Sequence, residues 1–284
     1  MSGELLANAK LGAGETVRWM DPAGPLVISF VAGARPGHYR LRHADEIIVD
    51  ILHDRQIVTQ VRAGLSQTTL DHFLADQVLP RAKAHSGDFV LHAGAVRVDD
   101  EAILLMGASG RGKSTLVTSL DSAGLALLGD DAMVISCLDD RPRTKAVYPS
   151  LRLLPDSIAA LFSESWTTTK VAHYSSKRRI DVPRPNVGSI DSVAIAAIFI
   201  IAEPVADAPI NLRRMTVPQA CITFVENSFA LDPSDTSRAA DRLAAASALA
   251  RRVPTFELSY PRDYGQLAKV REHILDRVKT EWPA

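Results

Sequence analysis

The chain has 284 residues, a formal net charge of −1 and only two cysteines, Cys137 and Cys221. This length can bury a substantial core, in one large domain or in a small and a larger one. The near-zero charge gives no general attraction to nucleic acid or acidic membranes, and two cysteines are too few for a disulfide framework or a cysteine-based zinc site.

Two stretches of the sequence bear on the cellular compartment of the protein. Met1–Leu11 lacks the charged region and apolar core that a secretory signal combines. The longest apolar run, Val193–Ala202, is about half as long as a membrane-spanning helix must be. We therefore expect a cytoplasmic protein whose partners include neither a membrane nor a nucleic acid.

The first part of the chain has the pattern of a small α+β domain. Turn-forming Gly, Pro and Asp residues separate strand-like runs at Leu26–Val31, Ile47–Leu52 and Gln56–Arg62. Apolar residues then recur at helical spacing over 66–85, and Ser66 is suited to be the N-cap of that helix.

A break follows this helix at Ser86-Gly87-Asp88. We expect a domain boundary here, with an N-terminal α+β domain over residues 1–86 and a second domain over residues 87–284. Docking of a substrate and oligomerisation are two alternative roles for the first domain.

The second domain opens with the pattern of a β-hairpin. The strand-like runs Phe89–Val98 and Ala102–Met106 are separated by a short polar break, Asp99-Asp100. If the turn has two residues, Val98 faces Glu101 and the numbers of cross-strand partners sum to 199. His92 then lies opposite Gly107. The alternative is that His92 is a structural histidine on a buried strand.

The second strand runs into a glycine-rich loop that fits the phosphate-binding pattern G-x-x-x-x-G-K-[ST]. Its backbone N–H groups would face a pyrophosphate at the start of the next helix, predicted to end before Gly124. Lys113 is suited to the β- and γ-phosphates, and Ser114 to Mg²⁺. A loop that binds nothing is the alternative. The candidate nucleotide-binding residues are Gly107, Ala108, Ser109, Gly110, Arg111, Gly112, Lys113, Ser114 and Thr115.

An acidic pair follows the next predicted strand, Leu125–Leu128, at Asp130 and Asp131. In P-loop enzymes a carboxylate at such a strand end binds Mg²⁺ or contacts the attacking hydroxyl. Neighbouring side chains on a strand point to opposite faces, so the two carboxylates are suited to different tasks. An ordinary polar turn is the alternative.

A basic run, Lys177-Arg178-Arg179, lies in a polar segment that we expect to be mobile. Its side chains are suited to close over a triphosphate or to grip an acidic substrate, although a solvated surface cluster has the same composition. The other predicted elements are strands at Met133–Leu138, Ala194–Ala202 and Thr255–Ser259, and helices ending at Phe162 or spanning Ser237–Arg252 and Asp263–Val278.

Three of these segments resemble, in order and spacing, the core of HPr kinase and its relatives: Leu91-His92-Ala93, Gly107–Ser114 and Gly129-Asp130-Asp131. The ending Phe256–Asp263 is similar to that of HPr-kinase-related bacterial serine kinases. The resemblance runs from Phe89 to the C-terminus. It implies an α/β P-loop kinase core of the HPr kinase/phosphoenolpyruvate carboxykinase type, in which a hairpin precedes the loop.

The resemblance also implies roles. Asp131 matches the catalytic base, and His92 matches the active-site histidine that interacts with the Asp130–Asp131 pair. Lys113 keeps a catalytic and phosphate-binding role, Asp130 a catalytic and metal-binding one, and Ser114 a metal-binding one. A second acidic metal ligand falls near Asp156, where the local pattern matches poorly. The Arg-Gly-rich signature of enzymes that also catalyse phosphorolysis is missing from the sequence.

Taken as a whole, the resemblance implies a kinase that uses ATP and Mg²⁺ to phosphorylate a serine of a protein or peptide. Some relatives act on precursors of ribosomally made peptides, including lasso peptides, and active HPr kinases are homo-oligomers. Two alternatives stay open: a small-molecule hydroxyl kinase on the same fold, and a nucleotide-binding regulator without transfer activity.

Overall fold

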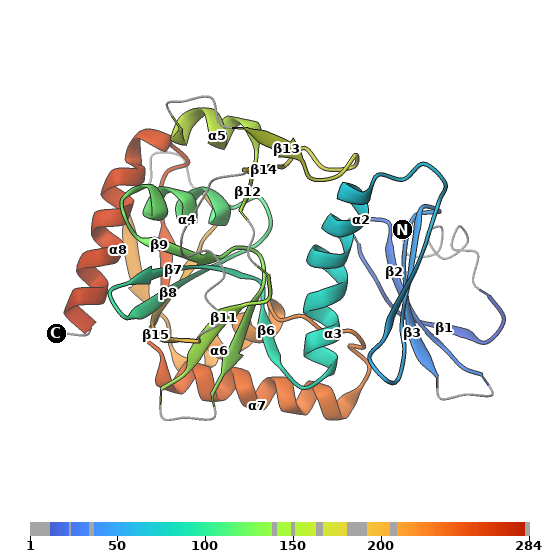
Figure 1. The fold of residues 1–284 in the computed structure, drawn as a ribbon. Helices are drawn as coiled ribbons and strands as arrows, with labels where there is room; N and C mark the ends of the chain where they lie inside the picture. The colour runs from blue at the N-terminus through green and yellow to red at the C-terminus, as the bar shows by residue number, and fades with distance from the viewer. Residues whose placement is uncertain are drawn as a thin grey trace. The chain divides into compact units, whose positions relative to one another are not determined.

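The computed structural model describes residues 12–22, 24–33, 37–137, 141–148, 151–162, 167–180, 192–204 and 209–281 (Figure 1). The expectations placed on Met1–Leu11 and on Leu138 lie outside these residues. The chain divides into two compact units. The first comprises Met1–Gly87 and Ala230–Ala240, and the second comprises Asp88–Phe229 and Asp241–Ala284.

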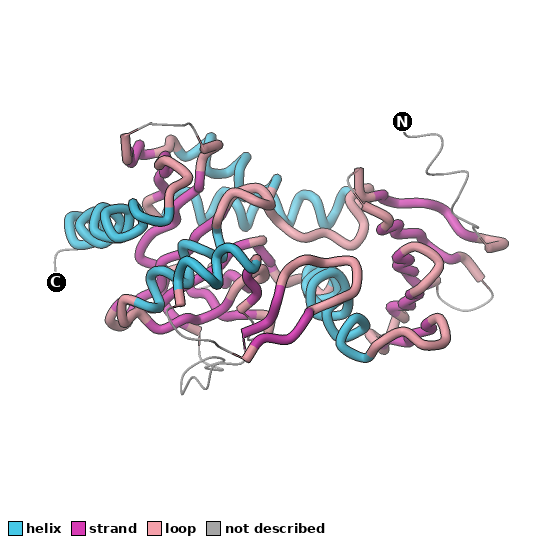
Figure 2. The backbone as a smooth tube through the Cα atoms, turned by 90° about the horizontal axis from the view of Figure 1, so that it is seen from above, coloured by secondary structure: helices cyan, strands magenta, loops and turns pink. Residues whose placement is uncertain are grey.

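The first unit contains one antiparallel sheet and one helical segment. The sheet is a meander, in which each strand pairs with the next along the chain. Figure 2 shows strands of this sheet in magenta near the N-terminus. The predicted strands and helix are present, whereas β1 and β3 were not expected. The elements are β1 (Glu15–Met20), β2 (Leu26–Val31), β3 (His38–His43), β4 (Ile47–Ile51), β5 (Ile57–Val61), α2 (Gln67–Phe73), η1 (Leu74–Val78) and α3 (Leu79–His85).

Alternation along the strands gives this sheet two different faces. One face buries Ile28, Leu41 and Val49 completely, and they share a core with Phe73 and Val78 of the helical segment. The helix begins as predicted, because the Ser66 side chain accepts a hydrogen bond from the Thr69 N–H at 3.3 Å.

The other face of the sheet carries an ionic network. Arg40 contacts Asp50 at 2.6 Å and Glu15 at 2.9 Å, and Arg42 also pairs with Glu15. The hydrogen bond from Arg42 outweighs the effect of burial and lowers the pKa of Glu15 to about 2.

The second unit is built on a nine-stranded mixed sheet and a separate three-stranded sheet. The three-stranded sheet has the order β12 (Arg152–Leu153), β14 (Arg178–Ile180), β13 (Thr168–Lys170). The nine strands are β6 (Phe89–Leu91), β7 (Ala93–Val98), β8 (Glu101–Met106), β9 (Ala126–Gly129), β10 (Met133–Ser136), β11 (Arg143–Ala146), β15 (Val193–Ile201), β16 (Asn211–Arg214) and β17 (Thr255–Ser259).

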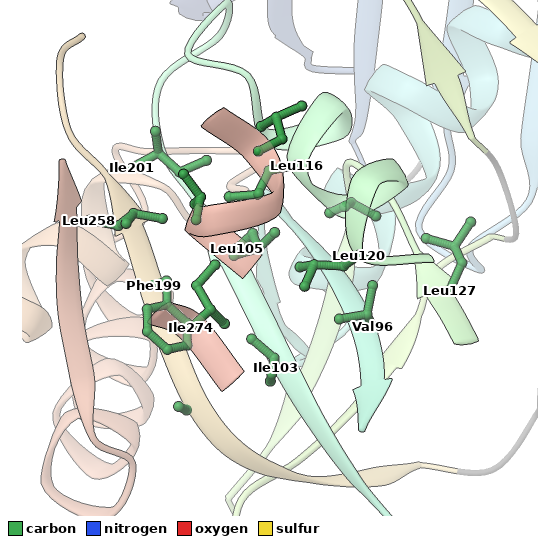
Figure 3. Packing of buried hydrophobic residues seen from close by; sticks show 14 of the residues in the cluster. Val96, Ile103, Leu105, Leu116, Leu120, Leu127, Phe199, Ile201, Leu258 and Ile274 are labelled. Carbon is green, nitrogen blue, oxygen red and sulfur yellow. The ribbon is translucent and has the colours of Figure 1, made fainter. Parts of the chain in front are cut away.

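Helices cover both faces of the nine-stranded sheet, which makes this unit a mixed α/β structure. The helices are α4 (Lys113–Ser122), α5 (Pro155–Leu161), α6 (Val217–Glu226), α7 (Thr236–Arg252), η2 (Tyr264–Gln266) and α8 (Leu267–Glu281). On β8, Ile103 and Leu105 belong to the core under α4 and α8 (Figure 3). Leu104 and Met106 on the same strand belong to the core under α6 and α7.

The predicted hairpin has the predicted register. Val98 pairs with Glu101, and the ladder continues to Ala93 opposite Met106. The strand expected over Phe89–Val98 is nevertheless interrupted at His92. There the chain changes partners from β10 to β8 and β9, and the His92 N–H bonds outside the sheet to the Asn227 carbonyl at 2.8 Å.

Strand directions bring several strand ends to one edge of the sheet. β15 and β17 run parallel to β8, so all three end at that edge. β7 is antiparallel to β8 and therefore begins there, and β9, antiparallel to β7, ends there. The segments that follow or precede these strand ends, among them His92, Gly107 and Asp130, therefore meet at the same edge.

One further expectation concerned the membrane. Among the helices in the part of the chain that the structure describes, none combines the length and apolar character needed to cross a bilayer.

Candidate active site

The glycine-rich loop joins the end of β8 to the start of α4. Gly107, Gly110 and Gly112 all have positive φ, at 147°, 79° and 94°. A Cβ on Gly107 would also lie 3.0 Å from the Ile201 carbonyl oxygen, so only glycine fits there without a shift. Ala108, Ser109 and Gly110 at the tip of the loop are exposed.

Helix α4 begins immediately after this loop, with Gly112 as its N-cap. The first N–H groups of an α-helix have no partner within the helix, so they face the space above the loop with the positive end of the helix dipole. Lys113 is buried, and its Nζ donates to the Gly107 carbonyl at 3.0 Å. Thr115 contacts the Ser157 hydroxyl of α5 at 2.9 Å.

Asp131 lies in a strained turn between β9 and β10. Its φ is 73°, and the Ala132 N–H donates to the Asp130 carbonyl at 3.1 Å across it. This two-residue separation and positive φ are the geometry of a γ-turn, which is rare for a residue with a side chain. The turn buries Asp131, which is only 5% exposed, at the edge where the loop begins.

Three cationic or ionisable groups surround the Asp131 carboxylate. Its Oδ2 lies 2.9 Å from Arg152 Nη2, and its Oδ1 lies 3.6 Å from His92 Nε2 and 3.9 Å from Lys177 Nζ. Burial by itself would raise the pKa of Asp131, but the contact from His92 and the charges of Lys177 and Arg152 outweigh it. The pKa of Asp131 is therefore held well below its usual range, and the carboxylate stays ionised.

The pKa of Asp130 is raised, whereas that of Asp131 is lowered. It is completely buried, and neither of its carboxylate oxygens has a hydrogen-bond partner among the described residues. Burial and the neighbouring charge of Asp131 raise the pKa of Asp130 to about 7, with Lys177, Ser114 and Lys113 acting in the other direction. Orphaned buried carboxylate oxygens beside a serine hydroxyl are suited to hold a cation.

His92 is held from two sides at the break between β6 and β7. Its N–H bonds to the Asn227 carbonyl, and its ring centroid lies 6.0 Å from that of Phe229. The side chain remains 35% exposed, so an incoming molecule can reach the imidazole. The structure thus brings His92 and Asp131 together beside the loop.

The basic run does not act as one group, and the segment 170–179 that we expected to be mobile joins two short strands, with its first residue in β13 and its last two in β14. Lys177 contacts the acidic pair, with its Nζ 3.9 Å from Asp131 Oδ1. Arg178 donates to Thr168 on β13, at 2.7 Å to the hydroxyl and 3.1 Å to the carbonyl, and Arg179 is exposed on β14. Pairing between strands explains why Arg178 is turned away from the site.

Asp156 lies exposed in the first turn of α5. Within the described ranges, no group of three or more His, Cys, Asp or Glu side chains is placed to hold a metal ion. A cation at this site would therefore take few protein ligands, with Asp130 and Ser114 the candidates. This fits Mg²⁺, which usually keeps several waters and binds phosphate oxygens in addition to one or two carboxylates. A metal-binding role for Asp156 stays a prediction.

Arg152 was missed by sequence reasoning, although it makes the closest ion pair with Asp131. Its side chain is 4% exposed and also bonds to the Tyr148 hydroxyl. The available signal was a lone arginine inside the apolar run Leu151–Leu154, because a buried charge requires a partner. The identity of that partner could not be read from the sequence, since Asp131 lies in a turn between two strands of the other sheet of this unit.

The groups gathered at this edge of the nine-stranded sheet indicate which reaction they are suited to. It combines N–H donors and a lysine suited to phosphates, an orphaned carboxylate suited to a cation, and an ionised carboxylate within reach of an exposed histidine. These are the groups that phosphoryl transfer requires: donors that position phosphate, and an acceptor for the proton of an attacking hydroxyl.

No protein-family model matches the chain, and no curated protein sequence matches it. Among solved structures, the Hpr(Ser) kinase/phosphatase from Coxiella burnetii is similar to this chain at a TM-score of 0.36 and 12% sequence identity. The match covers 68% of this chain and 99% of that chain. So distant a likeness leaves the function to be argued from the geometry of the site.

Proposed function

We propose that this chain is a Mg²⁺-dependent kinase that transfers the γ-phosphate of ATP to a serine hydroxyl of a protein or peptide. The observation that carries the proposal is the meeting of an ionised aspartate with a glycine-rich loop and its lysine at one sheet edge. Asp131 has its carboxylate 3.6 Å from His92, beside the loop that begins at Gly107.

The loop and its lysine would position the donor. The N–H groups at the start of α4 would hold the phosphates. Lys113, which contacts the Gly107 carbonyl at 3.0 Å, would exchange that contact for a phosphate oxygen. Lys177 lies 3.9 Å from Asp131 and would help to offset the negative charge of the transferring group.

Asp130 and Ser114 would hold Mg²⁺. The fit rests on the two buried oxygens of Asp130, which have no hydrogen-bond partner among the described residues and lie near the Ser114 hydroxyl. Held by these two residues, Mg²⁺ would supply positive charge that offsets the negative charge of the phosphates during transfer.

Asp131 would receive the proton of the acceptor hydroxyl. Its low pKa keeps it ionised at neutral pH, so the carboxylate can accept a hydrogen bond from serine throughout that range. Asp131 is only 5% exposed, and His92 and Lys177, each 35% exposed, flank its carboxylate, so an acceptor would reach it by displacing these two side chains. A peptide precursor and a folded protein are both acceptors of the proposed class.

The experiment is transfer of label from γ-labelled ATP in the presence of Mg²⁺. Serine-containing peptides, free serine and other small hydroxyl metabolites are offered separately, each with the wild type and with Lys113→Ala. We expect label on a peptide serine, lost when that serine is alanine, and little transfer by Lys113→Ala. Wild-type kinetics in the Lys113→Ala variant would remove the loop from the site.

The two alternatives give different results in the same experiment. Label on free serine or another metabolite, with none on peptides, favours a small-molecule kinase. ATP binding without transfer to any acceptor favours a nucleotide-binding regulator, although the strained Asp131 turn beside the loop has no evident use in a protein that only binds nucleotide.

A further inference from the structure

We infer that Tyr260 and Tyr264 form the subsite for the base end of the nucleotide, on the side of the loop away from Asp131. The inference rests on the proposed function, because it assumes that the loop holds a triphosphate. It adds a binding surface contributed by the segment between β17 and α8.

The order of the strands determines which residues lie on each side of the glycine-rich loop. Along the edge where the site lies, the order is β9, β7, β8, β15, β17. Asp130 follows β9, two strands from β8 on one side, and Tyr260 follows β17, two strands from β8 on the other. Neighbouring strands are about 4.8 Å apart, so each lies roughly 10 Å across the sheet from the strand that carries the loop.

A nucleotide is an extended molecule that has to fit this order. Its terminal phosphate is needed near Asp131, since that carboxylate is the proposed proton acceptor. With the middle phosphates on the loop, the base then extends in the direction of β15 and β17. The side chains that follow β17 are therefore placed to contact it.

Tyr260 reaches the loop directly. Its hydroxyl oxygen lies 3.2 Å from the position that a Cβ on Gly112 would occupy, at the N-cap of α4. The ring packs against the core under α4 and α8. Burial raises the pKa of Tyr260 to about 12, so the hydroxyl stays protonated and can donate a hydrogen bond. Tyr260 thus forms a fixed wall beside the last glycine of the loop.

Tyr264 is held by its tip and exposed elsewhere. Its hydroxyl lies 3.2 Å from the Ser157 hydroxyl, which lies 2.9 Å from that of Thr115 in the first turn of α4. The Asp263 side chain accepts the Gly265 N–H at 2.8 Å and so fixes the turn that carries Tyr264. The residue nevertheless remains 45% exposed. An anchored and exposed aromatic ring is a stacking surface for a base, because every base has a π-face.

The test compares two ligands that share the phosphates and differ in the base. Dissociation constants for ATP and for inorganic tripolyphosphate are measured by calorimetry with Mg²⁺ for the wild type and for Tyr264→Ala. Loss of one stacking surface should weaken ATP about tenfold. Tripolyphosphate, which has no base, should bind the variant and the wild type equally well.

Three further variants test whether the aromatic ring of Tyr264 itself is responsible for the effect. Tyr264→Phe keeps the ring and should bind ATP like the wild type, although it loses the contact with Ser157. Tyr264→Trp enlarges the stacking surface and should bind ATP at least as well as the wild type. Tyr174→Ala removes a tyrosine of similar exposure, 40%, on the β13–β14 turn that also carries Lys177, which contacts Asp131, and should leave the ratio of the two constants unchanged.

The outcomes distinguish failure of the proposed base subsite from failure of the proposed function. If Tyr264→Ala leaves the ratio of ATP to tripolyphosphate affinity unchanged while the wild type binds both, the subsite is wrong and the proposed function stands. If the wild type binds neither ligand, both fail. A lowered ratio in Tyr174→Ala instead of Tyr264→Ala would place the base on the opposite side and overturn the inference.

Discussion

Asp131 is the residue at which strain, burial and charge coincide. A side chain at φ 73° costs on the order of 1–3 kcal/mol, and such positions persist where the surroundings hold them. Here the surroundings include Arg152 at 2.9 Å, the closest of the cations that contact the carboxylate. The ion pair ties the strained turn between β9 and β10 to the first strand of the three-stranded sheet.

Replacing Arg152 by methionine should therefore destabilise the protein. Arg152→Met removes the closest cation from the buried Asp131 carboxylate and leaves the more distant Lys177 beside it. Breaking a buried ion pair costs about 3 kcal/mol. We expect Arg152→Met to lose about that much free energy of unfolding, measured by urea denaturation at pH 7. Arg262→Met, after β17, replaces an exposed arginine and should stay within about 0.5 kcal/mol of the wild type. Equal losses in both variants would contradict the role given to the ion pair.

At the scale of elements, Gly94 on β7 sets how closely the strand approaches α4 and the acidic pair. A Cβ at Gly94 would lie 2.6 Å from Val117 Cγ2 and 3.1 Å from Asp130 Oδ1. Both distances are shorter than normal packing allows, so a side chain here has to displace the helix or the carboxylate. The fit between β7 and α4 thus depends on one glycine.

The variant Gly94→Ala should lose about 1–3 kcal/mol of unfolding free energy, since overpacking forces neighbours to move. Gly33→Ala is the matched control, because a Cβ at Gly33 meets nothing within 4 Å. Thermal unfolding of the two variants measures the difference. A Gly94→Ala protein as stable as Gly33→Ala would show that α4 can shift without cost.

How much of the fold the sequence predicts depends on the length of each element. The β7–β8 register could be predicted because a two-residue turn at Asp99-Asp100 fixes it. Strands β12, β13 and β14 have two or three residues each, too few for any periodicity to be visible. Helix α6 was also missed, although Thr216 and Gln219 form a capping box at its start.

The candidate site, like the fold, could be predicted from the sequence only in part. Strand order and register suffice to predict that His92 lies near Gly107, and the ladder ends one pair short of that position. The γ-turn at Asp131 is a local conformation that the residues of the turn do not specify, and the ion pair with Arg152 joins residues that are distant in the sequence. The catalytic, nucleotide-binding and metal-binding roles assigned to the site residues stay predictions.

At the scale of the whole molecule, each of the two units has a hydrophobic core of its own. The core of the first unit includes Leu231, which the chain contributes after it has formed most of the second unit. Tyr39 on β3 donates to Asp232 at 3.0 Å and so helps to hold the returning segment. The first unit therefore depends on residues from two distant parts of the chain.

The stability of the molecule should fall in acid partly because of Glu15 in the first unit. Its pKa is lowered from 4.5 to about 2 in the folded protein, so its ionised form stabilises the fold above about pH 4.5. That contribution, at most about 3 kcal/mol, is lost as the pH falls through 4.5 toward 2. In urea unfolding, Glu15→Gln should have a lower free energy of unfolding than the wild type at pH 7. Between pH 5 and about pH 2.5 that free energy should fall less in the variant than in the wild type.

A control for this prediction is Glu272→Gln, which removes an exposed carboxylate from helix α8 of the second unit. Its dependence on pH should follow that of the wild type. An unchanged acid dependence in Glu15→Gln would mean that the ion pairs with Arg40 and Arg42 persist in the unfolded chain or contribute nothing.

The most direct test of the central claim is a single-turnover measurement of phosphate transfer by Asp131→Asn at saturating ATP and Mg²⁺. If Asp131 accepts the proton of the acceptor, the rate should fall by about 10²–10⁴-fold while the dissociation constant for ATP changes little. Transfer at the wild-type rate by the variant, with ATP bound equally well, would contradict the claim that this carboxylate and the loop act together.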